Sequence, residues 1–256
     1  MNVIGIIPAR MGSSRFPGKP LAKICDLTML EHVCRRSVMS KNLSSVYVAT
    51  CDEEIKTAVE AFGGKVCMTS PAHERASDRV AEAMAQIEKD KKQKVDIVVM
   101  IQGDEPMVFP EMIDDSSAPL LKDSNIMVAN LMAPLVVTPE NDPNEIKVVV
   151  DKDNNALYFS RSPIPSTMKA SQEVKRYKQV CIIPFRRDFL LQFNQLSQTP
   201  LEIAESVDMM RVLENGYKVK MVPSRFETYS VDTPEDLTRV EVHMLKDPLY
   251  KLYKKP

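Results

Sequence analysis

The first half of the chain alternates short apolar runs with segments whose apolar residues recur at helical spacing. Val3 to Pro8 is a continuous apolar run that stops at its proline, a pattern typical of a strand buried on both faces of a parallel sheet. Thr28 to Met39 carries apolar residues at the spacing of a helix. Further strands are predicted at Ser45–Thr50, Lys65–Met68 and Val95–Ile101, and further helices at Glu53–Phe62 and Ser77–Ile87, with Ser77 as the N-cap. This order predicts a doubly wound, mostly parallel sheet, which binds ligands at the carboxyl ends of its strands.

In the second half, turn signals such as Asp153-Asn154-Asn155 separate the predicted elements. Strands are predicted at Ile146–Val150, Ala156–Ser160, Val180–Phe185 and Lys218–Val222. Helices are predicted at Phe189–Leu196, Leu201–Asn215 and Pro234–Leu245, the last capped by Thr233 or Asp232. The tail from Lys246 to Pro256 is expected to be loosely attached.

The composition is that of an ordinary globular protein and narrows the choice of partners. Of 256 residues, 44% are hydrophobic and 27% charged, and the net charge of −1 argues against nucleic acid as a bulk partner. The chain has neither a signal-peptide pattern at its start nor an apolar run of the roughly 18 residues that span a membrane. Five scattered cysteines without a CxxC pair indicate thiols in a reducing compartment. We therefore expect a cytoplasmic protein with no membrane partner.

A polar stretch that contains glycine, from Pro8 to Pro20, joins the first predicted strand to the first helix. It offers backbone N–H groups, and its candidate side chains are Arg10, Ser13, Ser14, Arg15 and Lys19. Hydroxyl and N–H donors together with cations are what a triphosphate needs. The stretch lacks the GxxxxGK[ST] spacing of a Walker A loop. The alternative is a solvated basic loop, but a phosphate site belongs at this position after the first strand.

Two acidic motifs supply candidate metal ligands. Gln102-Gly103-Asp104-Glu105-Pro106 directly follows an apolar strand, where a carboxylate is well placed to hold Mg²⁺ against phosphates and Gln102 can bind a sugar or base. The alternative for this motif is a simple Asp–Glu turn. Asp232 lies just before a helix that starts at Pro234, and taken alone this pattern favours an N-cap role.

Taken together, stretches of this sequence resemble the CMP-Kdo synthetases (3-deoxy-manno-octulosonate cytidylyltransferases), within the larger family that also activates sialic acids. The matching stretches are IIPARMGSSRFPGKPL, VATCDEEI, AFGGKVCMTSPAH, SDR, IQGDEP, KVVVD, ALYFSRSPIP, RVLENG and VDTPEDL. They run from the first strand to the last helix, so the resemblance covers nearly the whole chain. It implies an α/β, Rossmann-like nucleotidyltransferase fold in a single domain, with a core at about 1–135 and 215–246. A smaller lobe at about 136–214 would serve dimerisation and acceptor binding in a homodimer.

The resemblance also implies a role for individual residues. The CTP phosphates would be held by Arg10, Ser13, Ser14, Arg15 and Lys19. Ser77 and Arg79 match positions near the nucleotide, and Gln102 matches a residue that bridges nucleotide and sugar. Asp104 and Asp232 match a pair of Mg²⁺ ligands. The implied reaction is attack of the sugar's anomeric hydroxyl on the α-phosphorus of CTP, with catalysis from Arg10, Arg15, Lys19, Asp104 and Asp232.

The sequence departs from the family pattern on the acceptor side. Arg75-Ala76-Ser77 replaces the family's Ser-Gly-Thr, Gln179 and Ile183 replace His and Tyr, Asp208-Met209 replaces Glu-Gln, and Ser230 replaces Gly. The residues expected near the acceptor are Arg75, Gln102, Arg161, Gln179, Ile183, Glu205, Asp208 and Met209. Losing polar groups at Ile183 and Met209 weakens the recognition of hydroxyls. Arg75 either meets an extra anion on the acceptor or is a solvated charge at the start of a helix.

The acceptor therefore stays open between Kdo, a modified Kdo, another 2-keto-3-deoxy sugar acid and a phosphonate. Cytosine is inferred only from the resemblance, so a nucleotidyltransferase for another base remains an alternative. A non-catalytic nucleotide-binding homologue would have no need to keep Arg10, Lys19, Asp104 and Asp232. A structural subunit acting through its dimer face would show a large exposed apolar surface.

Overall fold

The computed structural model describes residues 1–12, 16–135, 142–169, 171 and 174–254, which form two compact units. Unit 1 comprises Met1–Asp114 and Thr228–Pro256, and unit 2 comprises Asp115–Glu227. The expected lobe boundaries, at about 136 and 215, fall inside unit 2. The difference arises because the strands on either side of that lobe, at 129–134 and 220–223, pair in one sheet with the second-half strands.

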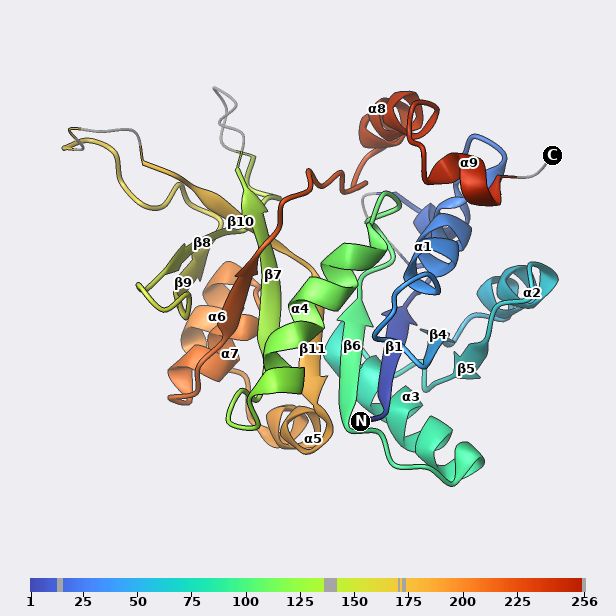
Figure 1. Ribbon diagram of the computed structural model, residues 1–256, viewed down its shortest axis with the longest axis horizontal. Coiled ribbons are helices and arrows are strands. Elements are labelled where there is room, and N and C mark those ends of the chain that lie inside the picture. Colours follow the sequence, from blue (N-terminus) through green and yellow to red (C-terminus); the bar gives the residue numbers. More distant parts are fainter. Residues whose placement is uncertain (13–15, 136–141, 170, 172–173, 255–256) are drawn as a thin grey trace. The chain divides into compact units, whose positions relative to one another are not determined.

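Unit 1 is built on four parallel strands in the order β6–β1–β4–β5 (Figure 1). They are β1 (Val3–Pro8), β4 (Ser45–Thr50), β5 (Val66–Met68) and β6 (Ile97–Ile101). The strands β1 and β6 are buried along almost their whole length, which explains their continuous apolar runs. The connecting helices are α1 (Met29–Ser37), α2 (Glu53–Ala61) and α3 (Ala76–Lys91). The parallel sheet and its helical connections confirm the predicted α/β fold class.

The start of α3 differs from the prediction. Arg75 is the N-cap residue, with extended backbone angles, and α3 begins at Ala76. Ser77 lies inside the first turn and is completely buried, so the prediction that it caps the helix is wrong. A sequence pattern identifies a hydroxyl near a helix start, but it does not reveal which of the first residues turns toward the core.

Unit 2 contains a five-stranded, mainly antiparallel sheet in the order β12–β7–β10–β8–β9. Its strands are β7 (Ala129–Pro134), β8 (Lys147–Val150), β9 (Ala156–Ser160), β10 (Tyr177–Val180) and β12 (Lys220–Pro223). The unit also contains β11 (Ile182–Arg186), α5 (Arg187–Gln195), α6 (Pro200–Glu205) and α7 (Met209–Glu214). In the described part of the chain, no helix is long and apolar enough to cross a membrane.

Two predicted elements of unit 2 are each split in the structure. The run predicted as one strand breaks at Cys181 into β10 and β11. The run predicted as one helix breaks at Ser206, whose φ of +53° is left-handed and ends α6 before α7 begins. The helix α4 (Pro110–Lys122), which was not predicted, has Pro119 in its interior, a residue that normally argues against a helix.

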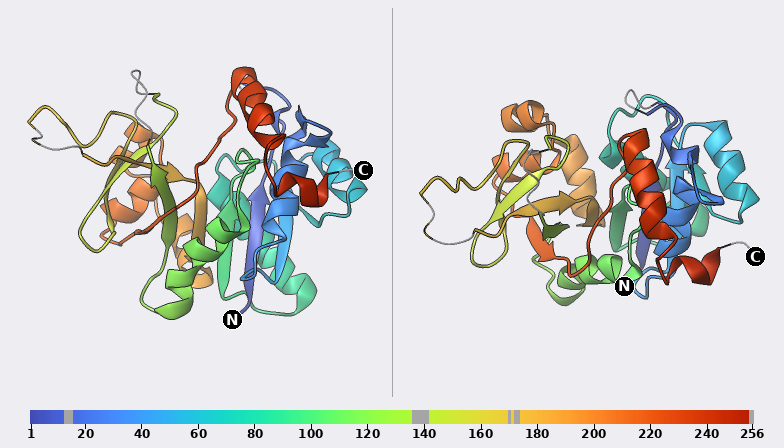
Figure 2. Two further views of the ribbon diagram at one scale, coloured as in Figure 1. Left: turned by 45° about the horizontal axis from the view of Figure 1, so that its top comes forward. Right: turned by 90° about the horizontal axis from the view of Figure 1, so that it is seen from above.

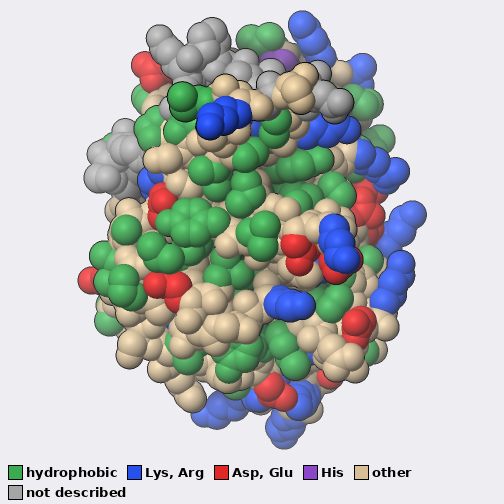
Figure 3. All heavy atoms as spheres, turned by 90° about the vertical axis from the view of Figure 1, so that its left-hand side faces the viewer, with side chains coloured by type: hydrophobic (Ala, Val, Ile, Leu, Met, Phe, Trp, Pro, Cys, Tyr) green, Lys and Arg blue, Asp and Glu red, His purple; other side chains and the backbone are tan. Residues whose placement is uncertain are grey.

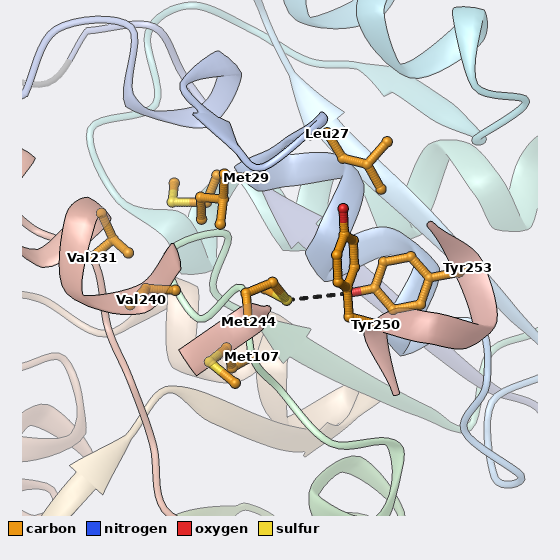
Figure 4. Close-up of a cluster of buried hydrophobic side chains, with 9 residues drawn as sticks. Leu27, Met29, Met107, Val231, Val240, Met244, Tyr250 and Tyr253 are labelled. Atoms are coloured by element: carbon orange, nitrogen blue, oxygen red, sulfur yellow. Dashed lines mark hydrogen bonds between the residues drawn. The ribbon is translucent and has the colours of Figure 1, made fainter. Parts of the chain in front are cut away.

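The C-terminal segment is firmly packed, so the prediction of a loosely attached tail is wrong. It contains α8 (Pro234–Met244) and the short helix α9 (Tyr250–Tyr253). The helix α8 contacts β2 (Lys23–Ile24), which pairs with β3 (Leu27–Thr28) in a two-stranded sheet. Tyr250 and Tyr253, which are 4% and 9% exposed, join a core cluster with side chains of the N-terminal part (Figure 4). Figure 2 shows α9, in red, beside the blue N-terminal helix α1. The prediction failed because a four-residue helix leaves almost no periodic signal in a sequence.

A buried polar network fastens α9 to α1. The Arg36 guanidinium is fully buried and forms an ion pair with Asp247, while its Nε donates to the Tyr253 hydroxyl at 2.7 Å. His32 contacts the same hydroxyl through Nδ1 at 2.9 Å and the Ile24 carbonyl through Nε2 at 2.9 Å. Burial lowers the pKa of His32 to about 4, so the imidazole is neutral at physiological pH.

Candidate active site

A cavity of about 330 Å³ lies in unit 1, at the carboxyl ends of its strands. Three segments line it, namely the residues after β1, the residues leading into α3, and the residues after β6. The cavity-lining residues include Arg10, Gly12, Lys19, His73, Arg75, Arg79, Gln102, Gly103 and Asp104. A parallel sheet presents its ligands at this edge, so the position agrees with the sequence-based expectation.

The loop after β1 is anchored from α2. The Met11 N–H donates to Asp52 Oδ2 at 2.8 Å, and Asp52 is the residue just before α2. Arg10 is exposed and faces the cavity beside Gly12. The predicted site residues Ser13, Ser14 and Arg15 lie outside the described residues. The anchoring role of Asp52 was not predicted, because its partner is a backbone N–H from a distant segment.

Lys19 brings the two predicted metal ligands together. Its Nζ lies 3.2 Å from Asp104 Oδ2 and 3.3 Å from Asp232 Oδ1. The same ammonium group donates to the Val231 carbonyl at 2.9 Å. A backbone hydrogen bond of 2.9 Å from Val231 N–H to the Asp104 carbonyl joins the two motifs directly. Two carboxylates from distant parts of the sequence therefore converge on one cation at the cavity.

The structure assigns the N-cap of α8 to Thr233 rather than Asp232. Thr233 Oγ1 accepts from the Asp236 N–H at 3.2 Å, and Asp236 Oδ2 accepts from the Thr233 N–H at 3.0 Å, which completes a capping box. The Asp232 carboxylate points instead to Lys19. Asp232 is therefore not the N-cap residue of α8, although the local sequence pattern favours that role.

The wall formed by residues 73–76 is held by two side chains of α3. Arg79, only 3% exposed, donates to Thr69 Oγ1 at 2.6 Å and to the His73 carbonyl at 3.4 Å. Glu82 Oε2 accepts from the Ser70 N–H at 2.9 Å and pairs with His73 Nε2. Burial alone would raise the pKa of Glu82, but the contacts with Ser70 and His73 outweigh it and lower that pKa. Arg79 and Glu82 therefore position the wall, and the part of Glu82 was not predicted.

Other expected acceptor residues lie in unit 2, where Arg161 and Glu205 bind each other. The Arg161 N–H donates to Glu205 Oε2 at 2.8 Å, and Arg161 Nε donates to the Glu205 carbonyl at 2.7 Å. Glu205 also accepts from the hydroxyls of Ser160 and Tyr158, at 2.9 and 3.2 Å. Burial raises the pKa of Glu205, yet these donors outweigh it and lower the pKa below the ordinary value. Glu205 is therefore an ionised anchor between β9 and α6.

The remaining expected acceptor residues have structural surroundings in unit 2. Ile183 and Met209 are 3% and 0% exposed and belong to the hydrophobic core, so their burial does not support contact with an acceptor. Gln179 donates to Asn130 Oδ1 at 2.6 Å across neighbouring strands. Asp208 is the residue that precedes α7. The departures from the family pattern at Ile183 and Met209 are therefore packing changes in this structure.

A parallel sheet whose strand ends present cations and paired carboxylates defines an α/β protein that binds phosphates. The profile of the cytidylyltransferase family matches residues 4–221. The 3-deoxy-manno-octulosonate cytidylyltransferase of Geobacter metallireducens is 44% identical over 251 residues, which cover 94% of this chain and 96% of that protein. The corresponding protein of Geotalea uraniireducens is 45% identical, with coverage of 94% and 98%. The chain therefore belongs to the cytidylyltransferase family, and within it to the CMP-Kdo synthetases.

Solved structures agree with this assignment. The structure of CMP:2-keto-3-deoxy-manno-octonic acid synthetase complexed with CTP matches with a TM-score of 0.88 and 36% identity, over 96% of this chain and 99% of that chain. The 4-diphosphocytidyl-2C-methyl-D-erythritol synthase of Anaerococcus prevotii matches with a TM-score of 0.64 at 13% identity, over 95% and 96% of the two chains. At this low identity, the second match shows only that the two proteins share a fold.

Proposed function

We propose that this chain transfers CMP from CTP to a 3-deoxy-2-keto sugar acid, Kdo or a close relative, and releases pyrophosphate. The observation that carries the proposal is the convergence of Lys19, Asp104 and Asp232 at a cavity in unit 1. The named activity of the relatives and the CTP bound to a similar structure support both the donor and the acceptor class. Five cysteines present as thiols accord with a reducing compartment, and we propose the cytoplasm.

The paired carboxylates fit a divalent cation, which we propose to be Mg²⁺. In phosphate sites Mg²⁺ uses one or two protein carboxylates, and substrate phosphates and water complete its coordination. Asp104 and Asp232 are such a pair. Among the described residues no group of three or more His, Cys, Asp or Glu forms a metal site, so phosphate oxygens and water would supply the other ligands.

In the proposed reaction, the anomeric hydroxyl oxygen bonds to the α-phosphorus of CTP and loses its proton to solvent, while the bond from that phosphorus to the β-phosphate oxygen breaks and pyrophosphate leaves. Mg²⁺, when bound, supplies positive charge that lowers the electrostatic barrier. Lys19 and Arg10, which both face the cavity, neutralise the triphosphate and the departing pyrophosphate. On the resemblance alone, Ser13, Ser14 and Arg15 are proposed to join them.

For the acceptor, we propose contacts from Gln102 and Arg75, which both line the cavity. Arg75 is half-buried at the start of α3, where the positive end of the helix dipole also favours an anion such as the acceptor carboxylate. Arg161 and Glu205 are proposed to position the segment after β9 rather than to bind the acceptor through their guanidinium and carboxylate groups. Their hydrogen bonds to each other and to the backbone already occupy those groups.

We further propose that the protein forms a homodimer through unit 2. Figure 3 looks onto the side that carries β8, β9 and α6, where hydrophobic side chains gather in the middle of the face. Leu157 of β9 is 60% exposed and Ile203 of α6 is 62% exposed, and we propose that both lie in the interface. Sedimentation velocity should give a dimer for the wild type and a monomer for Leu157→Lys; a wild-type monomer would remove this proposal.

The catalytic proposal is tested by pyrophosphate release from Asp104→Ala. We expect turnover to fall by about 10³-fold or more, because a carboxylate that holds charge at the reacting phosphate is lost. Asp90→Ala, which removes an exposed carboxylate of α3, is the matched control and should keep wild-type turnover. Wild-type activity in a folded Asp104→Ala protein would remove the metal-ligand role of Asp104.

A further inference from the structure

The Lys19 ammonium group is fully engaged at the carboxylate pair. Its three acceptors are Asp104 Oδ2 at 3.2 Å, Asp232 Oδ1 at 3.3 Å and the Val231 carbonyl at 2.9 Å. A lysine ammonium has three N–H donors, so this arrangement uses them all. The Lys19 side chain is only 14% exposed, and the two carboxylates are 24% and 20% exposed. Lys19 can therefore bind a phosphate oxygen only after it releases at least one of these partners.

We propose that Lys19 holds the place of the divalent cation between Asp104 and Asp232 until a nucleotide enters, so that metal and nucleotide bind together rather than metal first. The inference rests on the proposed function, since it assigns an order of binding to the same site. It gives Lys19 a second role besides neutralising phosphate charge.

Electrostatics makes the two cations competitors. The two carboxylate oxygens lie no farther apart than the sum of their distances to Lys19 Nζ. A Mg²⁺ ion bound to both would lie about 2.1 Å from each oxygen, and therefore within a few ångströms of the ammonium group. A unit charge and a double charge repel strongly at that separation in a partly buried site. Metal binding to both carboxylates thus favours departure of Lys19.

The departure of Lys19 is favourable only when a new anion receives it. A triphosphate in the cavity supplies that anion, because Lys19 itself lines the cavity. Nucleotide and metal should therefore each raise the affinity of the protein for the other, as thermodynamic linkage requires. A metal ion without nucleotide would have to displace the ammonium with no compensation.

The backbone around Lys19 allows this exchange through the side chain alone. Lys19 begins a 3₁₀ turn (Lys19–Leu21), and its N–H donates to the Phe16 carbonyl at 3.2 Å. The preceding Gly18 has φ = +73°, which fixes a left-handed turn there. Lysine has a flexible four-carbon stem that can swing its charge between two sites. The exchange therefore needs no rearrangement of the fold.

The test uses Mn²⁺ as the probe and the full chain without nucleotide. Binding is measured from the loss of the electron paramagnetic resonance signal of free Mn²⁺. We expect wild type to bind Mn²⁺ weakly and Lys19→Met to bind it about tenfold more tightly or better, since a unit charge beside the ion is lost. Lys23→Met removes an exposed lysine on β2 and should match wild type. If Lys19→Met fails to fold by circular dichroism, Lys19→Gln carries the same test.

A second arm adds CTP without acceptor, with the Mn²⁺ bound by free CTP subtracted. The gain in Mn²⁺ affinity on adding CTP should be smaller in Lys19→Met than in wild type. Mn²⁺ affinity that is unchanged or weaker in Lys19→Met without nucleotide would overturn the inference. Tighter Mn²⁺ binding in that variant, together with no release of pyrophosphate from CTP by wild type with any acceptor, would keep the inference and overturn the proposed function.

Discussion

Neutralising Asp247 should destabilise the protein strongly, although this residue lies in the segment that the sequence predicts to be loose. The Arg36 and Asp247 side chains are 0% and 2% exposed, so each is the buried counter-charge of the other. Removing one member of such a pair leaves an uncompensated buried charge, which typically costs about 3–5 kcal/mol. Asn keeps the shape of Asp and can still accept a hydrogen bond, so we expect Asp247→Asn to lower the free energy of unfolding by about 3 kcal/mol, the lower end of that range.

The smaller change Tyr253→Phe removes only a hydroxyl. That hydroxyl contacts both Arg36 Nε and His32 Nδ1, and leaving a buried polar group unsatisfied costs about 1–3 kcal/mol. We therefore expect Tyr253→Phe to lower the free energy of unfolding by less than Asp247→Asn does, but by more than a surface substitution does. Asp188→Asn is the surface control, because the Asp188 side chain is 72% exposed and its ion pair with Arg187 should contribute at most about 1 kcal/mol.

Urea denaturation followed by circular dichroism measures these losses. A loss of about 3 kcal/mol moves the midpoint by roughly 1 M urea if the slope stays near 3 kcal/mol/M. A loss below about 1 kcal/mol for Asp247→Asn, equal to that of Asp188→Asn, would refute the reasoning. It would mean that the C-terminal segment is as loosely held as its sequence suggests.

Three further results are expected. Lowering the pH from about 6.5 to about 4 should reduce the unfolding free energy of the wild type by about 3 kcal/mol through His32, because its folded-state pKa of about 4 lies below the ordinary 6.5 and the unfolded chain binds the extra proton. His32→Asn should show a flatter pH profile of unfolding free energy, and a slope equal to that of wild type would contradict this. Glu82→Gln should raise the KM for CTP about tenfold with kcat nearly unchanged, because it weakens the contacts with Ser70 and His73 that hold the wall formed by residues 73–76. The exposed Glu60→Gln should change neither constant. Arg75→Ser should raise the acceptor KM and leave the CTP KM alone; an unchanged acceptor KM would make Arg75 a solvated charge at a helix start.

The apolar pattern predicts best where a strand is buried on both faces. The bounds of β1 and β4 agree with the predicted ones, because each run is bordered by residues that end a strand. The strand β9 is also correctly bounded, with turn residues before it and a polar segment after it. In these strands, local sequence and tertiary burial favour the same structure, so periodicity is sufficient.

Prediction fails where a tertiary contact decides between local alternatives. The apolar run Val180 to Phe185 predicts only the last residue of β10, because Lys178 and Gln179 interrupt the apolar pattern in that strand, and nothing within the run marks the break at Cys181. The left-handed backbone at Ser206 is uncommon for serine, so the break between α6 and α7 has no strong local signal. The helix α4 forms despite Pro119, since burial of its apolar side favours a helix that propensity disfavours.

The sequence predicts which residues form the candidate site better than it predicts the contacts between them. The positions of Lys19, Asp104 and Asp232 follow from the strand ends and the resemblance, but the hydrogen bonds of one ammonium group to both carboxylates depend on the fold. The anchors Asp52 and Glu82 bind backbone N–H groups of distant segments, and such contacts leave no motif in a sequence.

The central claim is that this site transfers CMP to a sugar acid, and pyrophosphate release tests it most directly. The assay contains Mg²⁺, either CTP or UTP, and one acceptor from Kdo, 8-amino-Kdo, a sialic acid or a phosphonate. The account predicts release with CTP and Kdo or a close relative of Kdo, and no release with UTP. A folded protein that binds CTP yet releases no pyrophosphate with any of these acceptors would contradict it.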